Sequence, residues 1–283
     1  MLNETRFSIM TRLEDARKAV LNASRSYYAH MGYYEECTYA EDTNRCELDF
    51  LEFVFRTVAS HKVRDVLDVA CGSGRHVLGL AHRGYRCTGQ DYTPEQVQMA
   101  KVRAKREGVS MKLLQGDATK LEYESKFDAV LAIRILFLLP DDESVLTCLR
   151  QVHRALKSGG IMVCNIANPF YDGENWFSLK SIYRGHYFAE TVVPGMRFIS
   201  IDRVEDFDPI HGVALWNETH VIEVPDGVHI FREHEHLRLL TYWDILHYLQ
   251  AAGFKQIKCY PDWNTKPPKK PKAEWLVFVS RKD

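Results

Sequence analysis

The chain has 283 residues, a formal net charge of −1, 46% hydrophobic residues and 27% charged residues. This balance is typical of a globular protein, and the near-neutral charge gives no general attraction to nucleic acid. No apolar run reaches the roughly 18 residues of a membrane span, and the N-terminus lacks a signal-peptide pattern. We therefore expect a cytoplasmic protein with no membrane contact.

The cysteines give no sign of a metal site or of a disulfide framework. All seven are scattered along the chain, and none forms a C-x-x-C spacing. Zinc sites and small disulfide-rich domains both need closely spaced cysteines, so we expect reduced, structural thiols and no bound metal.

The first 43 residues predict a helical segment outside the main fold. Apolar residues spaced for one helix face predict a helix over 7–31, and a group of tyrosines, including Tyr33, follows it. A second helical stripe predicts a helix over 44–59.

The most informative stretch is a buried strand followed by a glycine turn. The apolar run 66–70 predicts the strand, and Gly72 and Gly74 follow where the chain must turn into a helix. Such a turn offers free amide groups to a polar ligand. The dinucleotide fingerprint would need a third glycine where Val77 stands, and Asp68 would repel a pyrophosphate but attract a cation. An NAD(P)-dependent oxidoreductase, which would share the sheet, remains an alternative that these two residues oppose.

Strands and helices alternate from residue 65 to residue 168. The expected strands are 65–70, 85–90, 111–115, 127–133 and 160–167, and the expected helices are 75–83, 94–107 and 141–157. Alternation of this kind predicts an α/β fold with a parallel sheet and helices on both faces. Ligands of such sheets bind outside the carboxyl ends of the strands, where Asp68, Asp91 and Asp117 are expected.

Five motifs follow one another along the chain in the order that is found in one protein family. They are the glycine turn, Gly89-Gln90-Asp91-Tyr92, Gly116-Asp117-Ala118, the run 127–131 and the turn at Gly159-Gly160. Over roughly residues 44 to 168 the chain resembles the class I S-adenosylmethionine-dependent methyltransferases of the small-molecule type. The resemblance implies a Rossmann-like fold and S-adenosylmethionine as cofactor.

The resemblance also implies a set of cofactor-binding residues. Asp68, Gly72 and Gly74 would hold the amino-acid part of the cofactor, Asp91 the ribose hydroxyls and Asp117 the adenine amino group. The expected set is completed by Ala70, Arg75, Tyr92, Ala118, Ile133 and Tyr33. Tyr33 is a candidate for a lid, since an aromatic face favours a methylsulfonium cation.

Residues 171–240 depart from the alternation and predict an antiparallel insertion that covers the substrate. The expected strands are 196–205, 213–224 and 228–240. Asp226-Gly227 is a strong signal for a two-residue hairpin loop.

With that loop, Glu218 faces Glu235 on neighbouring strands, which is unfavourable for like charges. The functional hypothesis is a pocket for an amine substrate. The alternative is a solvated face neutralised by His220 or nearby basic residues, and the opposite face, with His234 and His236, is an equally open candidate for the substrate side.

The expected catalytic residues depend on whether the methyl acceptor is an amine or a hydroxyl. A neutral amine needs no strong base, whereas a hydroxyl needs one. Four histidines of the cover segment are the candidates: His186, His220, His234 and His236. Arg134, at the end of the fourth strand, faces the reaction centre in the family arrangement. The candidate catalytic set is Arg134, His234, His236, Glu218 and Glu235.

The sequence thus predicts four parts: a helical lid (1–43), a cofactor-binding core (44–170), a substrate cover (171–240) and a return to the core with a helix and two strands (241–283).

The layout loosely resembles N-methyltransferases acting on amines and amino sugars, so a small-molecule amine is the expected acceptor. A small-molecule O-methyltransferase is the alternative. An RNA-modifying enzyme would need an extended basic surface, at which only 266–272 hints. The expected oligomeric state is a monomer or a homodimer.

Overall fold

A computed structural model describes residues 41–283 except 174–177, 194–195, 226 and 266–272. The predicted helix 7–31, Tyr33 and the lysine-rich run 266–272 lie outside the described residues. Among the helices that are described, none is both long and apolar enough to cross a membrane.

A seven-stranded sheet forms the centre of the fold, in the order β10-β11-β5-β4-β1-β2-β3. Its strands are β1 (Asp65–Asp68), β2 (Arg86–Asp91), β3 (Lys112–Gln115), β4 (Phe127–Ala132), β5 (Leu156–Ala167), β10 (Lys255–Pro261) and β11 (Trp275–Arg281). The pairs among β1 to β5 are parallel, and β11 runs antiparallel to both of its neighbours. The predicted α/β class and parallel core are confirmed.

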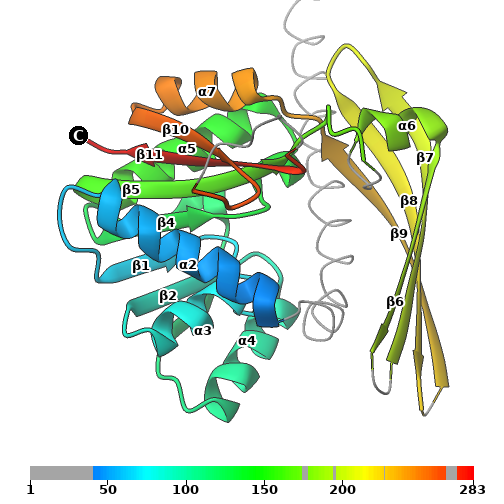
Figure 1. The fold of residues 1–283 in the computed structure, drawn as a ribbon, viewed down its shortest axis with the longest axis horizontal. Coiled ribbons are helices and arrows are strands. Elements are labelled where there is room, and N and C mark those ends of the chain that lie inside the picture. The colour runs from blue at the N-terminus through cyan, green and yellow to red at the C-terminus, as the bar shows by residue number, and fades with distance from the viewer. Residues whose placement is uncertain (1–40, 174–177, 194–195, 226, 266–272) are drawn as a thin grey trace, which may run out of the picture.

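Helices cover both faces of this sheet (Figure 1). On one face lie α2 (Glu41–Thr57), α3 (Arg75–His82) and α4 (Pro94–Arg106), and on the other lie α5 (Asp142–Ala155) and α7 (Tyr242–Ala251). Two 3-10 turns, η1 (Ala118–Lys120) and η2 (Leu136–Leu138), follow β3 and β4.

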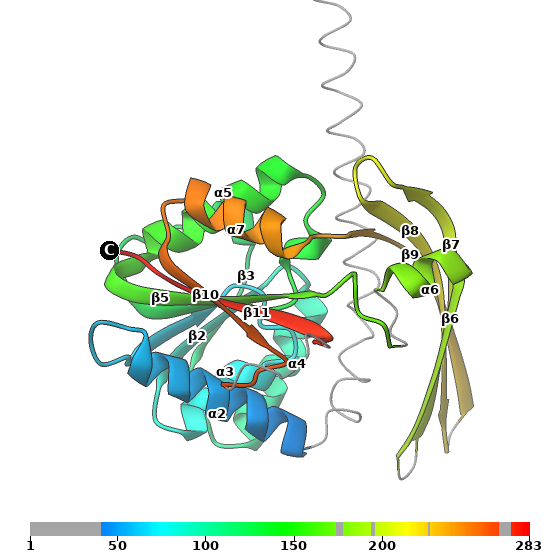
Figure 2. The same ribbon diagram turned by 45° about the horizontal axis from the view of Figure 1, so that its top comes forward.

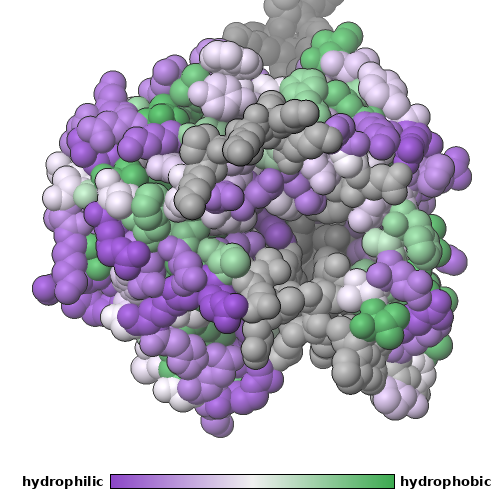
Figure 3. Space-filling view, in the orientation of Figure 1, coloured by the Kyte–Doolittle hydropathy of each residue, from purple (hydrophilic) through white to green (hydrophobic). Residues whose placement is uncertain are grey.

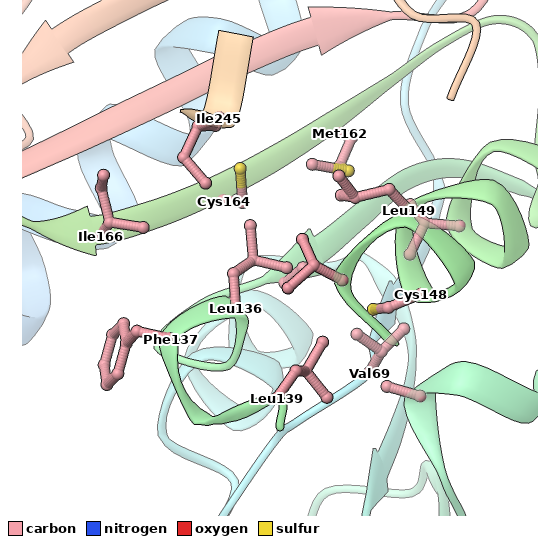
Figure 4. Packing of buried hydrophobic residues seen from close by; sticks show 14 of the residues in the cluster. Val69, Leu136, Phe137, Leu139, Cys148, Leu149, Met162, Cys164, Ile166 and Ile245 are labelled. Carbon is pink, nitrogen blue, oxygen red and sulfur yellow. The ribbon is translucent and has the colours of Figure 1, made fainter. Parts of the chain in front are cut away.

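The two helix layers bury two separate hydrophobic clusters against the sheet. All six residues of β4 are buried, as expected for a strand covered on both faces. Figure 4 shows the cluster on the α5 side, where Leu136 and Phe137 of η2 lie among side chains of β5, α5 and α7. This packing fixes the segment that follows β4, which adjoins the edge where ligands bind in such folds.

The boundary between α5 and β5 differs from the prediction. The helix was expected to continue to residue 157 and the strand to begin at 160, but α5 ends at Ala155 and β5 begins at Leu156. Leu156 pairs with Phe127 at the start of β4, so ladder pairing takes over from the helical pattern. The strand therefore begins before Gly159 and Gly160.

A second, four-stranded antiparallel sheet stands beside the core, in the order β6-β7-β8-β9 (Figures 1 and 2). It consists of β6 (His186–Val193), β7 (Met196–Asp208), β8 (Val213–Val224) and β9 (Gly227–Arg238) and is preceded by α6 (Leu179–Arg184). The antiparallel insertion is confirmed, although the sequence analysis did not predict β6 or α6.

The predicted hairpin register is wrong by two residues. Val224 pairs with Gly227, so Glu218 lies opposite Glu233, and Glu235 lies opposite Trp216. Because side chains alternate between faces with a period of two, this shift keeps Glu218 and Glu235 on the same face. Glu218 therefore does not lie opposite Glu235 as predicted, but the residue opposite it, Glu233, is also an acid.

The two faces of the second sheet differ in burial. The inner face packs on the core through Ala214, Trp216 and Leu237, which share a cluster with η2. The outer face exposes apolar side chains, including Phe188 and Ile230. In the space-filling view the visible surface over the core is mainly hydrophilic, and hydrophobic patches lie on the side of the second sheet (Figure 3).

Candidate functional site

The glycine turn after β1 has the geometry that only glycine adopts readily. Gly72 has φ of 53° and Gly74, at the start of α3, has φ of 91°. A Cβ at Gly74 would lie 3.0 Å from Leu78 Cδ1 and 3.2 Å from the Ala100 Cβ, so a side chain there would crowd both α3 and α4. The turn is therefore a tight cradle with no side chain at these two positions. The expected free amides are not found there: the Gly72 amide donates to Asp91 Oδ2 and the Gly74 amide to the Cys71 carbonyl.

Asp68 closes β1 at the entrance to this turn. Its side chain is 1% exposed, and its Oδ1 accepts a hydrogen bond of 3.2 Å from the Ala70 amide. A buried carboxylate at this position gives the turn a negative charge, which suits a cationic group of a ligand and not a phosphate.

Asp91 closes the neighbouring strand, β2. Its Oδ2 accepts a 2.8 Å hydrogen bond from the Gly72 amide, and its Oδ1 accepts a 2.9 Å bond from the Thr93 amide. One carboxylate thus connects the glycine turn with the start of α4, and its position is set by two backbone groups.

Asp117 follows β3 and caps η1. Its Oδ1 accepts hydrogen bonds of 2.8 Å and 2.6 Å from the amide and hydroxyl of Thr119, and Lys120 lies 3.2 Å from its Oδ2. Burial alone would raise the pKa of this carboxyl, but the bonds from Thr119 and Lys120 hold it below its ordinary value. Ala118, the next residue, is 4% exposed.

The three aspartates therefore lie at the carboxyl ends of the adjacent strands β1, β2 and β3. We call Asp68, Asp91, Asp117 and the glycine turn the cofactor rim. A rim with a cradle that a Cβ would fill and with acidic acceptors fits a ligand that carries an ammonium or sulfonium charge, hydroxyls and an amino group. S-Adenosylmethionine has all of these, so the residues present fit that cofactor.

Other predicted cofactor residues lie in different surroundings. Arg75 belongs to a buried ion cluster with α2, in which Glu47 Oε2 lies 2.6 Å from the Arg75 guanidinium and 2.7 Å from His76 Nε2. Tyr92, next to Asp91, is 38% exposed. Ile133 is buried directly after β4, and Tyr33 lies outside the described residues.

Arg134 occupies a strained position after β4. Its φ is 56°, which is uncommon for a residue with a Cβ, and its amide donates a 2.7 Å bond to Asn165 Oδ1. The guanidinium carbon lies 4.8 Å from the centre of the Trp275 ring. Strained backbone of this kind concentrates at functional sites. Asn165 and Trp275 were not predicted, although a polar residue within the apolar strand β5 was a usable signal.

The inner face of the second sheet holds a buried cluster of ionisable groups that we call the acidic face: Asp202, Glu218, His220 and Glu235. The side-chain ligand atoms of Asp202, Glu218 and His220 all lie within 4.8 Å of one another. Each of the four residues is at most 5% exposed. Burial raises the pKa of Asp202 to about 6, although the Ser200 hydroxyl donates a 2.7 Å hydrogen bond to it.

Glu218, His220 and Glu235 were predicted from the sequence, whereas Asp202 was not. Asp202 lies directly opposite Glu218 across β7 and β8, and Ser200 lies opposite His220. The alternating polar positions 200 and 202 within the predicted strand 196–205 were the signal that would have found it.

The histidines named as candidate bases are separated by the sheet. His234 and His236 alternate with Glu233 and Glu235 along β9 and so lie on the outer face, away from Glu218. His234 Nδ1 is 3.3 Å from Glu205 Oε2, and burial together with His234 lowers the pKa of His236. His186 is exposed on the same outer face. The structure therefore brings His220, and not these three, to the acidic residues.

Comparisons with known proteins relate the chain to methyltransferases. Residues 66–160 match the model of a methyltransferase domain. A ubiquinone biosynthesis O-methyltransferase of Alkalilimnicola ehrlichii is 32% identical over 136 residues, which cover 47% of this chain and 52% of that protein. The chain thus spans about half the length of that relative.

Solved structures resemble the fold over most of the chain. A methyltransferase from Clostridium acetobutylicum described as S-adenosylmethionine-dependent superposes with a TM-score of 0.71 at 17% identity, covering 88% of this chain and 96% of the other. The sugar N-methyltransferase KedS8 from Streptoalloteichus has a TM-score of 0.63 at 19% identity, covering 85% and 88%. Residues 66–160 are a methyltransferase domain, and the fold is that of class I methyltransferases.

Proposed function

We propose that this chain, an S-adenosylmethionine-dependent methyltransferase that acts on a small molecule, transfers the methyl group to an amine nitrogen. The observation that carries the proposal is the acidic face. Asp202, Glu218 and Glu235 bring three carboxylates to one buried surface, and a cationic amine is the ligand that such a surface favours. The similarity to KedS8, whose description names it a sugar N-methyltransferase, supports the same choice.

The groups of the acidic face are close enough together to bind one small cation, and His220 Nε2 lies only 3.6 Å from Glu218 Oε2. Three acceptors, each about 2.8 Å from a single tetrahedral nitrogen, would lie about 4.6 Å from one another. The ligand atoms of Asp202, Glu218 and His220 all lie within 4.8 Å of one another. The three groups can therefore accept hydrogen bonds from one ammonium with small adjustments.

The location of the acidic face supports a role for it in binding the methyl acceptor. Trp216 lies two residues before Glu218 on the same face of β8 and packs in one cluster with Leu136 and Phe137 of η2. The strand face that carries Glu218 thus continues into the cluster that packs η2, the turn that follows Arg134.

Methyl transfer to an amine requires a bound cofactor, a deprotonated acceptor nitrogen and a site with little water, and residues of this chain are suited to each requirement. When bound, the cofactor supplies a methyl group already activated by its sulfonium charge. Asp68, Asp91 and Asp117 would hold it at the rim. An ammonium has no lone pair, so the acceptor nitrogen must first lose a proton, and a buried carboxylate such as Asp202 is suited to accept it. The low exposure of the acidic face, at most 5% for each of its residues, would limit the access of water to the acceptor.

A second candidate is methyl transfer to a hydroxyl, which the relative named as an O-methyltransferase also suggests. One observation favours it: His220 is 2% exposed, and its Nε2 lies 3.6 Å from Glu218 Oε2. A histidine oriented by a carboxylate is the usual base for a hydroxyl. Both candidates use the same buried face, so they differ in the acceptor and not in the site.

The test is a methyl-transfer assay over paired amines and alcohols of the same carbon skeleton, with wild type, Glu218→Gln and Asp202→Asn. The control is Glu223→Gln, since Glu223 lies on the same strand but on the outer face. We expect methylated amines, a loss of at least tenfold in kcat/KM in the two inner-face variants, and little change in the control. Methylation of the alcohols alone, or equal losses in all three variants, would refute the amine proposal.

A further inference from the structure

A pocket lies at the edge of the sheet opposite to the cofactor rim. It has a volume of about 850 Å³ and is formed by the end of α2, the loop 59–64 and the turn between α3 and β2. Five cationic side chains line it: Arg56, Lys62, Arg64, Arg83 and Arg86. No carboxylate is among its lining residues within the described part of the chain. The lining of the pocket is therefore basic, although Asp65 and Asp128 lie near it at the amino ends of β1 and β4.

Carboxylates outside the lining of this basic pocket neutralise only two of its five cations, Arg83 and Arg86. Arg83 contacts Asp49 at 2.7 Å and Glu52 at 2.6 Å, and Arg86 contacts Asp65 at 2.7 Å. These carboxylates hold the two guanidinium groups in place.

The other three cations, Arg56, Lys62 and Arg64, are exposed. Within the described residues no ion pair joins any of them to a carboxylate. The pocket thus combines two fixed cations with three that are available to a ligand, in a chain whose net charge is −1.

Favourable interaction with a helix dipole explains the positions of only two of the five cations, Arg56 and Arg83. Arg56 lies in the last turn of α2 and Arg83 caps α3, positions where a cation interacts favourably with the helix C-terminus. Lys62, Arg64 and Arg86 lie outside helices. Their convergence on one cavity is not explained by helix stability.

The pocket also has apolar walls. Phe55 and Val63 are buried residues of its lining, and the half-buried Tyr85 ring lies beside them. Small-molecule sites commonly have volumes of about 300 to 1,000 Å³ and combine apolar walls with a few polar groups. The ligand that matches this composition has an anionic head and an apolar or aromatic body.

We propose that this pocket is a binding site for a phosphate monoester of a small molecule. The phosphate would contact Arg64 and Lys62. A guanidinium group can donate two parallel hydrogen bonds to two oxygens of one phosphate, and a lysine ammonium attracts the phosphate as a point charge. The body of the ligand would lie on the half-buried Tyr85 ring, which packs on Phe55. β1 has four residues, so the pocket and the cofactor rim lie about 13 Å apart at its two ends. The ligand is therefore a second molecule and not the methyl acceptor, and the proposal stands whatever that acceptor is.

Calorimetric titration of the full chain with phenyl phosphate, inorganic phosphate and phenol at constant ionic strength tests the proposal. We expect phenyl phosphate to bind more tightly than inorganic phosphate, and phenol not to bind. The double variant Lys62→Gln, Arg64→Gln should weaken phenyl phosphate at least tenfold while the affinity for S-adenosylhomocysteine stays within twofold, which also confirms folding. The control Lys101→Gln, an exposed lysine on α4, should leave both affinities unchanged.

Two results would overturn the proposal. One is the absence of any heat of binding for phenyl phosphate at millimolar concentration with wild type. The other is an affinity that the double variant leaves unaltered, which would place the anion elsewhere. Neither result depends on which acceptor the enzyme methylates.

Discussion

The amide of Gly72 donates a 2.8 Å hydrogen bond to Oδ2 of Asp91. The two residues belong to different strand ends, since Gly72 follows β1 and Asp91 closes β2. The bond keeps the glycine turn and the acid next to each other before any ligand binds. A preformed arrangement of this kind lowers the cost of ordering the site on binding. The cofactor rim is thus part of the folded core.

The first prediction concerns the glycine turn. Gly74→Ala should destabilise the protein by about 2 to 4 kcal/mol, because it adds crowding against Leu78 and Ala100 to an unfavourable φ of 91°. Gly84→Ala is the matched control: its φ is 89°, but nothing lies within 4 Å of the added Cβ. It should cost only about 1 kcal/mol. Urea denaturation measures both, and equal losses would show that packing at Gly74 contributes nothing.

The second prediction concerns the buried ion cluster of α2 and α3. Glu47→Gln should lower the free energy of unfolding by about 3 to 5 kcal/mol, because it leaves Arg75 and His76 buried beside a neutral amide. Asp49→Asn, which removes a carboxylate that is 62% exposed, should cost under about 1 kcal/mol.

The loss in Glu47→Gln should also depend on pH. Burial opposes ionisation of Glu47, but His76 and Arg75 lower its pKa below 4.5 in the folded chain. A carboxyl with a lowered folded pKa stabilises the protein above the unfolded pKa, and this stability is lost as the pH falls through the folded pKa. The difference from wild type should therefore shrink below about pH 4.5. A difference that is constant from pH 7 to pH 3 would contradict the assigned charge.

The third prediction uses Asp202, whose pKa burial raises to about 6 from 3.8. The folded protein then keeps a proton that the unfolded chain has already released. Stability should therefore fall as the pH rises from about 4 to about 6, and Asp202→Asn should remove this slope. Chemical denaturation at pH 4.5 and pH 7 measures the effect. The variant should gain stability relative to wild type at pH 7, and an equal difference at both pH values would show that Asp202 is ionised throughout.

Much of the core was predictable because its signals are local. The apolar runs of β1 and β4, the glycines at 72 and 74 and the aspartates at the strand ends are each read from a few neighbouring residues. Pro94 at the start of α4 and Gly253 after α7, with φ of 96°, likewise lie at helix ends because of their own backbone preferences. The order of these signals along the chain then places them on one edge of a parallel sheet.

The second sheet was less predictable because its contacts are not local. The loop signal at Asp226-Gly227 located the hairpin but not its register, since a neighbouring pair of residues can also form the connection. The neighbour of Glu218 on β7 is Asp202, sixteen positions away in the chain, and only strand pairing brings the two together. Strand pairing decides which residues belong to the acidic face and places His234 and His236 on the opposite face. The structure was therefore needed to identify both.

The central claim is that the cofactor rim binds S-adenosylmethionine. Its most direct test is calorimetric titration of S-adenosylhomocysteine into wild type and Asp91→Ala, with NAD titrated into wild type as the comparison. We predict saturable binding of S-adenosylhomocysteine at one site, no binding of NAD, and an affinity at least tenfold weaker in a variant that still unfolds cooperatively. Binding of NAD in preference to S-adenosylhomocysteine, or an affinity that Asp91→Ala leaves intact, would contradict the account.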